Sequence, residues 1–301
     1  MEKVKKVSSK VRERRGDRAL LIIFYVIAAL FAVLCLYPFV QVFMSSFADE
    51  TTLVREGYKL IPSKMSVDAY RTLFASNQIL YAYGVTIFST VAGTALSLLI
   101  TALAAYALSG KKLKYRNVFN FFFYFTMLFS GGLIPYYILM KNYLHLTNSL
   151  LVYIIPGMFN VWNMFLLRNF FNDVPDSLRE AATLDGANEF VIAFRIILPL
   201  SLPALATVGL FSALTFWNEW MASMLYIDNE NLYTLQYLIV RMVNSISAAS
   251  DLGGLPAGIN TVPANTLRLA TAIVTIGPIV LLYPFLQKYF VAGLRVGGVK
   301  E

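Results

Sequence analysis

NDVPDSLREAATLDGA, residues 172–187, is a polar stretch that lies between two long apolar runs of the chain. Its residue order predicts a short helix, because Asp173 can cap the N-terminus and Pro175 presets the backbone of the first turn. Ser177 with Glu180 offers a second capping frame. The stretch is therefore expected to be an ordered helix rather than an irregular connection.

Gly186 marks the end of this helix, since a left-handed turn costs least where there is no Cβ. The small side chains of Ala181 and Ala182 would let one face of this helix fit into a groove, which favours contact with a partner protein. The spacing is equally compatible with an amphipathic loop that lies on a membrane surface. The residues alone leave both interpretations open.

The sequence on either side of this loop is typical of a membrane protein. Of its 301 residues, 58% are hydrophobic and only 14% are charged, which is too apolar for a water-facing surface of this size. About 20 apolar residues of helix cross a bilayer core. Six segments meet this length and predict an all-α, polytopic protein with six transmembrane helices: Ala19–Met44, Leu80–Ser109, Asn117–Met140, Asn142–Leu167, Ile196–Ile227 and Leu269–Gln287.

The first of these segments follows a basic stretch, as a secretion signal would. It is too long for the apolar part of such a signal and lacks a cleavage pattern, so it is expected to be a retained span. Glycines Gly131 and Gly132 and prolines Pro135 and Pro156 predict kinks in the third and fourth segments.

The distribution of basic residues predicts how the chain is oriented. If the N-terminus is cytoplasmic, that side holds 18 of the 25 Lys and Arg residues, and an excess of these residues marks the cytoplasmic side. Both termini are therefore expected in the cytoplasm. The predicted organisation is a basic N-terminus 1–18, a first span 19–44, an extracytoplasmic loop 45–79, a core 80–290 that includes the polar loop 169–199, and a cytoplasmic tail 291–301.

The polar loop resembles the EAA loop of ABC importer permeases. Glu180-Ala181-Ala182, Gly186, Ile196 and Leu198-Pro199 match that family's pattern position for position. In the family, this loop is a coupling helix that docks into a cleft of the ATPase subunit. The resemblance implies that the dock is formed by Glu180, Ala181, Ala182, Asp185 and Gly186, and that Ile196, Leu198 and Pro199 fix the helix that follows.

The C-terminal stretch from Lys288 to Lys300 is similar to the tail of the maltose-transporter type of sugar permease. That tail reaches between the ATPase subunits, which implies ATPase contacts for Gly293, Gly297, Gly298 and Lys300. The resemblance also implies a type I importer fold and a carbohydrate substrate. The chain departs from the family pattern at Glu301 and Trp220, where glycine and phenylalanine are frequent.

Several kinds of chemistry have no residues to support them. No GxxxxGK[ST] phosphate loop occurs, so ATP and Mg²⁺ are expected on partner ATPase subunits and no cofactor on this chain. With one histidine, His145, and one cysteine, Cys35, neither a metal site nor a catalytic triad is expected. The segregation of basic residues fits membrane topology better than nucleic-acid binding. The chain is therefore not expected to be an enzyme.

Glu219 is the one acidic residue inside a predicted span, and Trp217, Asn218 and Trp220 surround it. Carboxylates inside a membrane usually line a water-filled path. Tryptophans are enriched at the membrane surface, so an interfacial carboxylate is the alternative. These four residues are candidates for a translocation path or a contact with a binding protein.

The residues and the resemblance together predict a permease subunit of an ATP-driven, binding-protein-dependent importer of sugars or oligosaccharides. Its expected partners are a second, different permease, two cytoplasmic ATPases, an extracytoplasmic sugar-binding protein and the bilayer of a prokaryotic cell membrane. An importer of another polar solute, such as a polyamine or phosphonate, is the alternative, because the EAA loop does not encode the substrate. A secondary transporter or a membrane enzyme lacks support, since neither paired mid-membrane charges nor convergent catalytic groups are present.

Overall fold

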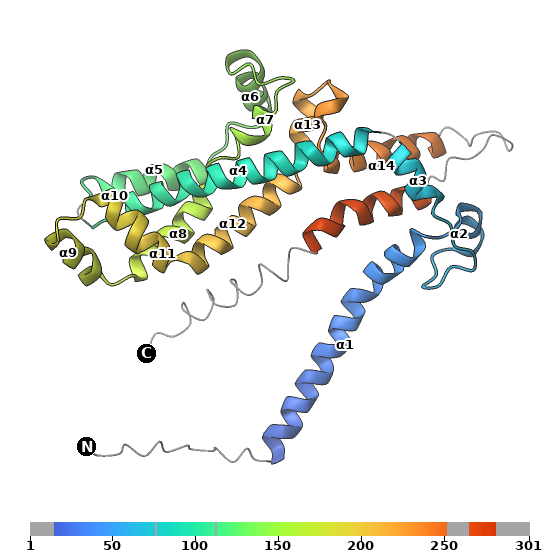
Figure 1. Cartoon of the computed structure of the whole chain (residues 1–301), viewed down its shortest axis with the longest axis horizontal. Coiled ribbons are helices and arrows are strands. Elements are labelled where there is room, and N and C mark those ends of the chain that lie inside the picture. The colour runs from blue at the N-terminus through green and yellow to red at the C-terminus, as the bar shows by residue number, and fades with distance from the viewer. Residues whose placement is uncertain (1–14, 76, 112, 252–264, 281–301) are drawn as a thin grey trace.

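The computed structural model describes residues 15–75, 77–111, 113–251 and 265–280, and all regular elements in these ranges are helices (Figure 1). One isolated bridge pairs Ala48 with Met65. The predicted all-α class is confirmed for this part of the chain. The elements are α1 (Arg15–Ser45), α2 (Glu50–Glu56), α3 (Asp68–Ala75), α4 (Gln78–Ser109), α5 (Arg116–Leu128), α6 (Leu133–Ile138), the π-helix η1 (Leu139–Tyr143), α7 (Leu151–Ile154), α8 (Val161–Asp173), α9 (Asp176–Leu184), α10 (Glu189–Ile192), the π-helix η2 (Ala193–Ile197), α11 (Leu198–Leu200), α12 (Leu202–Trp217), α13 (Met221–Tyr226), the 3₁₀-helix η3 (Glu230–Leu232), α14 (Leu235–Asp251) and a further apolar helix, Asn265–Val280.

The first helix, α1, stands apart from the other described helices (Figure 1). None of the apolar window within Leu20–Ser45 is buried, and side chains such as Phe24 and Leu34 are strongly exposed. Its own apolar side chains lie on all sides of the helix rather than along one stripe. Such a helix is stable only in lipid or against another protein, so α1 needs one of these environments.

The long helix α4 forms the centre of the remaining bundle, where it packs against α8 and α12. Small residues on α4 allow these close approaches. Ala102 and Ala105 are buried in one cluster with Leu167 of α8 and Val208 of α12. This cluster fixes the end of the bundle at which α9 and α10 lie.

A glycine cradle joins α4 to α12 further along the bundle. The ring of Phe216 lies against Gly93 of α4 and Gly157, and only 3% of Phe216 is exposed. A Cβ atom would come within 2.6 Å of the ring at Gly93 and 2.8 Å at Gly157. Both positions therefore require glycine for this packing.

The six predicted apolar segments are not six uninterrupted helices. In the described residues, two helices are long and apolar enough to cross a membrane, Leu20–Ser45 and Gln78–Ser109, or up to four if each of two bent helix pairs is one span. The segment predicted at 117–140 is one of these pairs, and its two parts meet at 105°. The break contains Gly132 with φ +87°, a conformation that ends the helix, so the kink predicted at Gly131 and Gly132 is confirmed.

The segments predicted at 142–167 and 196–227 are also interrupted. Between Tyr143, the last residue of η1, and Pro156, only Leu151–Ile154 is helical. The next helix, α8, begins after Asn160, whose side chain accepts a hydrogen bond from the Asn163 N–H at 3.0 Å. The later segment bends by 83° between Leu200 and Leu202, next to prolines on both sides. Proline removes a backbone donor and disturbs the preceding turn, which hydropathy alone does not register.

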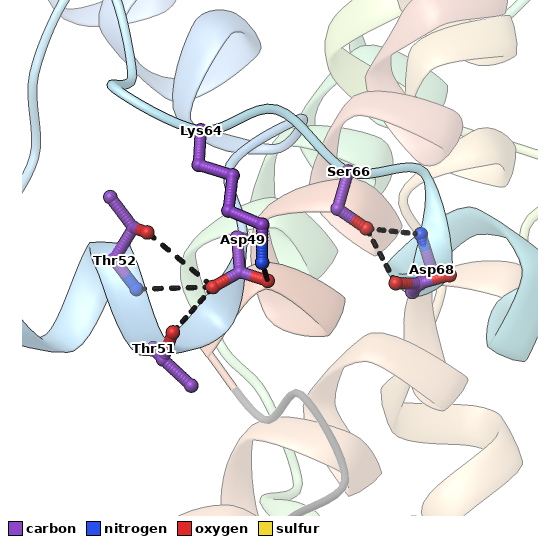
Figure 2. A network of polar contacts seen from close by, with 6 residues as sticks. All are labelled: Asp49, Thr51, Thr52, Lys64, Ser66 and Asp68. Carbon is purple, nitrogen blue, oxygen red and sulfur yellow. Dashed lines mark hydrogen bonds and ion pairs between the residues drawn. The ribbon is translucent and has the colours of Figure 1, made fainter.

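The connection between α1 and α4 is a small ordered unit rather than a loose loop. Figure 2 shows Asp49 before α2, with Thr51 and Thr52 on one side and Lys64 on the other. The Thr51 hydroxyl donates a hydrogen bond to the Asp49 carboxylate at 2.5 Å, and the Lys64 ammonium donates another to the same carboxylate at 3.1 Å. These hydrogen bonds lower the pKa of Asp49 to about 2, so the carboxylate that caps α2 stays ionised. Before α3, the Ser66 hydroxyl accepts a hydrogen bond from the Asp68 N–H at 3.0 Å and donates one to the Asp68 carboxylate at 2.7 Å.

Glu50 of α2 connects this unit to the helix Asn265–Val280. Its carboxylate accepts four hydrogen bonds: from the backbone N–H and side-chain amide of Asn265, both at 3.0 Å, and from the N–H and hydroxyl of Thr266, at 2.8 and 2.7 Å. The N-terminal N–H groups of a helix have no partner within the helix. Glu50 therefore caps a helix that begins 215 residues later in the chain.

Replacing Glu50 by alanine is expected to lower the free energy of unfolding by about 2 to 3 kcal/mol, because hydrogen bonds to a charged group are among the stronger ones. Glu50→Gln should have an intermediate effect, since one amide oxygen still accepts. Thermal unfolding of the purified protein in detergent checks this. The control is Glu56→Ala on the same helix, whose carboxylate contacts only exposed partners. Equal melting temperatures for the Glu50 and Glu56 variants would contradict the role of Glu50.

Candidate functional site

The loop from Val174 to Leu200 projects from one end of the bundle, beyond α8 and α4 (Figure 1). Its first helix, α9, is present where the sequence predicts it, but its start differs. Asp173 is the last residue of α8 rather than a cap, and Pro175 occupies the N-cap position without a side-chain hydrogen bond. The capping frame of Ser177 and Glu180 is likewise not formed. α9 is held at its first turn by Asp176, which accepts a hydrogen bond from Lys111, and this bond lowers the pKa of Asp176.

The end of α9 is as predicted. Gly186 has φ +81°, the Gly186 N–H donates to the Thr183 carbonyl at 3.1 Å, and the Ala187 N–H donates to the Ala182 carbonyl at 2.9 Å. These two bonds form a Schellman motif, which satisfies the last carbonyls of a helix and reverses the chain. The direction of α10 relative to α9 therefore depends on Gly186.

After this turn, the chain continues as α10, η2 and α11. The Asn188 side chain caps α10 by accepting a hydrogen bond from the Val191 N–H at 2.9 Å. Ile192 and Ile197 are buried, Ile196 and Leu198 pack at the edge of the same cluster, and Pro199 is exposed. The residues after the glycine thus fix the loop to the bundle.

The rear face of α9 is also fixed to the bundle, through both apolar and polar contacts. Ala182 is buried against the cluster that contains Phe171 of α8. The Arg179 guanidinium donates to the Ser109 hydroxyl at 2.9 Å and to the Phe171 carbonyl at 3.3 Å, and lies 5.3 Å from the centre of the Tyr106 ring. Arg179 therefore joins α9 to the ends of both α4 and α8.

A second polar contact joins α10 to α4, because the Tyr106 hydroxyl donates to the Glu189 carboxylate. Sequence reasoning missed Arg179, Tyr106, Glu189 and Lys111. Arg179 directly precedes Glu180, but its partner Ser109 lies 70 residues away on α4, so local spacing contained no signal for this contact.

The front face of the loop is exposed and is not covered by the other described residues. Glu180, Ala181 and Asp185 are exposed, and two large apolar side chains are exposed beside them: Leu184 at 88% and Phe190 at 72%. A hollow of about 500 Å³ lies between α9, α10 and the end of α4, and Glu180 and Leu184 contribute to its walls. Exposed apolar groups rimmed by charges mark surfaces that bind other proteins. This part of the loop therefore has the features of a docking surface, and the described residues contain no group of metal-ligating side chains.

The four residues predicted as a translocation path or binding-protein contact do not form one surface. Trp217 is 6% exposed, and its indole N–H donates to the Thr275 carbonyl at 3.3 Å. Asn218 is exposed and Trp220 is partly buried at the start of α13. Glu219 accepts a hydrogen bond from the Ala222 N–H at 2.8 Å and lines a small pocket.

The tail residues Gly293, Gly297, Gly298 and Lys300 lie outside the described residues. Their predicted contacts with an ATPase stay a prediction that rests on the resemblance.

The apolar helices are those of a membrane-embedded, multi-pass protein, and the partly exposed loop is fixed at one end of its bundle. Residues 97–296 match the family described as "Binding-protein-dependent transport system inner membrane component". The chain belongs to this family, and it is a permease component of a binding-protein-dependent transport system.

Individual relatives agree over nearly the whole chain. The chain is 40% identical over 272 residues to the polygalacturonan/rhamnogalacturonan transport system permease protein YtcP of Bacillus subtilis. This match covers 90% of this chain and 94% of YtcP. The chain is 30% identical to the arabinooligosaccharides transport system permease protein AraQ of Halalkalibacterium halodurans, with coverage of 90% and 94%. A solved bacterial ABC transporter involved in the import of the acidic polysaccharide alginate contains a chain that is 31% identical, with a TM-score of 0.78 and coverage of 92% and 99%.

Proposed function

We propose that this chain is one of two permease subunits of an ATP-driven importer of sugars or oligosaccharides in a prokaryotic cell membrane. Six spans with both termini in the cytoplasm put the α9–α10 loop on the cytoplasmic side, in agreement with the distribution of basic residues. The names of the relatives support a saccharide substrate, since they include permeases for polygalacturonan or rhamnogalacturonan and for arabinooligosaccharides.

The observation that carries this proposal is the two-faced structure of α9. Its front face, with Glu180 and Leu184, is exposed, while its rear face is fixed to α4 and α8 through Ala182 and Arg179. A helix that binds a partner on one face and the bundle on the other transmits a push between them. An ATPase subunit that closes on ATP would move α9, and the bundle would switch between inward-facing and outward-facing states according to its affinity for each.

The exposed α1 supports a second permease in addition to lipid. The described residues bury none of its apolar window, and side chains along it are strongly exposed. A different permease, two ATPases that hold ATP and Mg²⁺, and an extracytoplasmic binding protein complete the proposed assembly. This chain contributes movement and a path, while hydrolysis takes place on its partners.

Two substitutions in the docking loop test the proposal. Gly186→Pro fixes φ near −65° where +81° is needed and removes the N–H that donates to Thr183. Glu180→Lys reverses the charge on the docking face. In proteoliposomes that contain the complete transporter, each is expected to reduce ATP-driven sugar uptake at least tenfold, through release of the ATPase or through hydrolysis without uptake.

The matched control is Glu56→Lys, an equal charge reversal in α2 at a distance from the loop, which should leave uptake within twofold of wild type. Uptake that continues in the absence of any ATPase subunit would overturn the proposal in favour of a secondary transporter. Uptake of a polyamine or phosphonate in place of every sugar would retain the ATP-driven mechanism and replace the substrate.

A further inference from the structure

A small pocket lies where α6, α7 and α13 gather beside the end of α12 (Figure 1). It has a volume of about 160 Å³. Its walls include four aromatic rings and one carboxylate, contributed by Tyr136, Tyr153, Phe216, Tyr226 and Glu219. No lysine, arginine or histidine is among the residues that line it.

The carboxylate of Glu219 is held in a defined direction. One oxygen accepts the hydrogen bond from the Ala222 N–H at 2.8 Å, which ties the side chain to the first turn of α13. A carboxylate has more acceptor positions than this single bond uses. Glu219 can therefore accept further hydrogen bonds from a ligand that carries hydroxyl groups.

Tyr226 provides the second observation. It is 5% exposed, its ring stacks on Tyr137, and its hydroxyl has no hydrogen-bond partner among the described residues. The neighbouring Tyr153 hydroxyl, by contrast, is bonded to the Ser223 hydroxyl at 2.7 Å and the Leu232 carbonyl at 2.8 Å. A buried hydroxyl without a partner is unfavourable, and Tyr226 lines the pocket, so a small rotation of its side chain would let a ligand hydroxyl satisfy it.

We propose that this pocket is a subsite for one uncharged sugar unit, an inference that rests on the proposed function. Aromatic rings pack against the apolar faces of a sugar ring, and the Glu219 carboxylate and the Tyr226 hydroxyl bind its hydroxyl groups. A uronate unit is disfavoured, because its carboxylate would approach Glu219 in a partly buried site without a lining cation, and like charges repel strongly there.

This subsite distinguishes between the substrates named for the relatives. Arabino-oligosaccharides are uncharged, whereas alginate and polygalacturonan are acidic. Rhamnogalacturonan contains neutral rhamnose as well as acidic galacturonate units, and such a chain would place a neutral unit in the pocket. Selection at this position thus acts on the charge of a single unit.

Direct binding tests the subsite without the selectivity of the binding protein. The complete permease–ATPase assembly in nanodiscs is titrated with labelled arabinotriose, maltotriose and trigalacturonate by equilibrium dialysis. Wild type is expected to bind at least one neutral trisaccharide tenfold or more tightly than trigalacturonate. Tyr226→Phe should weaken the neutral ligand about fivefold, which corresponds to one net hydrogen bond of about 1 kcal/mol.

Glu219→Gln keeps an oxygen for the Ala222 N–H and removes the charge. It is expected to weaken the neutral ligand and to reduce the discrimination against trigalacturonate at least fivefold, a change in preference that a general loss of structure would not produce. Tyr143→Phe and Glu56→Gln, both outside the pocket, are the controls and should bind as wild type does.

Tighter binding of trigalacturonate than of both neutral trisaccharides to wild type would overturn the subsite, as would unchanged binding in both pocket variants. Absence of trisaccharide binding in an assembly that still imports sugar with its binding protein would overturn the subsite alone. Absence of ATP-driven uptake of every sugar would remove the proposed function and the subsite with it.

Discussion

Arg179→Met is expected to reduce sugar uptake about tenfold while ATP hydrolysis continues, so that fewer sugar molecules enter per ATP hydrolysed. The guanidinium bonds to Ser109 at the end of α4 and to the carbonyl of Phe171 at the end of α8. Methionine fills a similar volume but makes neither bond. The exposed face of α9 would still bind the proposed ATPase, but the movement of α9 would be transmitted to α4 less efficiently.

The ratio of uptake to hydrolysis in proteoliposomes measures this effect. Arg179→Lys should lie between wild type and Arg179→Met, because one ammonium does not reproduce the planar fork that reaches two acceptors and stacks on Tyr106. Arg195→Met is the matched control, since Arg195 is an exposed arginine of the same loop. A ratio equal to wild type in the Arg179→Met transporter would show that Arg179 has no part in coupling.

Gly93→Val is expected to cause the largest loss of folded protein. Even the first carbon of a side chain at Gly93 would come within 2.6 Å of the Phe216 ring, which is packed between Gly93 and Gly157. Forcing extra carbon atoms into a packed interior costs about 1 to 3 kcal/mol and at times more. Gly93→Ala should lower the melting temperature, and Gly93→Val should prevent accumulation of folded protein in the membrane.

Two further variants isolate the clash from the change of residue type. Gly84→Ala lies on the same helix with no atom within 4 Å of the new Cβ, so it should be neutral or slightly stabilising, because alanine favours helix over glycine. Phe216→Leu in the Gly93→Ala background should restore part of the lost stability by freeing space. Equal melting temperatures for Gly84→Ala and Gly93→Ala would disprove the tight packing at Phe216.

Features of the fold and site that depend only on residues close together in the sequence were predictable. The helix α9 and the left-handed Gly186 are local features, and both are found where the residue types require them. The kink at Gly132 is of the same kind. Hydropathy found the apolar segments but not their interruptions, because residues such as Pro156 and Ser201 change the backbone path without changing the mean polarity.

Contacts between distant residues could not be predicted in this way. Ser97 lies 115 residues from its partner Ser212, and Tyr153 lies 70 residues from Ser223. The cap at the start of α9 was mispredicted, because α8 continues through Asp173 and Pro175 takes the N-cap position of α9. Where α8 ends depends on how it packs against α4. This packing joins residues far apart in the chain, so local residue spacing does not predict it.

The cap that Glu50 provides for the helix Asn265–Val280 also sets an order of events during synthesis. Ribosomes add about 5 to 20 residues per second, so the Glu50 carboxylate leaves the ribosome roughly 10 to 40 s before Asn265, which follows 215 residues later. During that interval the acid has no helix end to bind. A nascent chain that stops before Asn265 therefore carries the Glu50 carboxylate at the start of α2 without the four hydrogen bonds that it accepts in the complete chain.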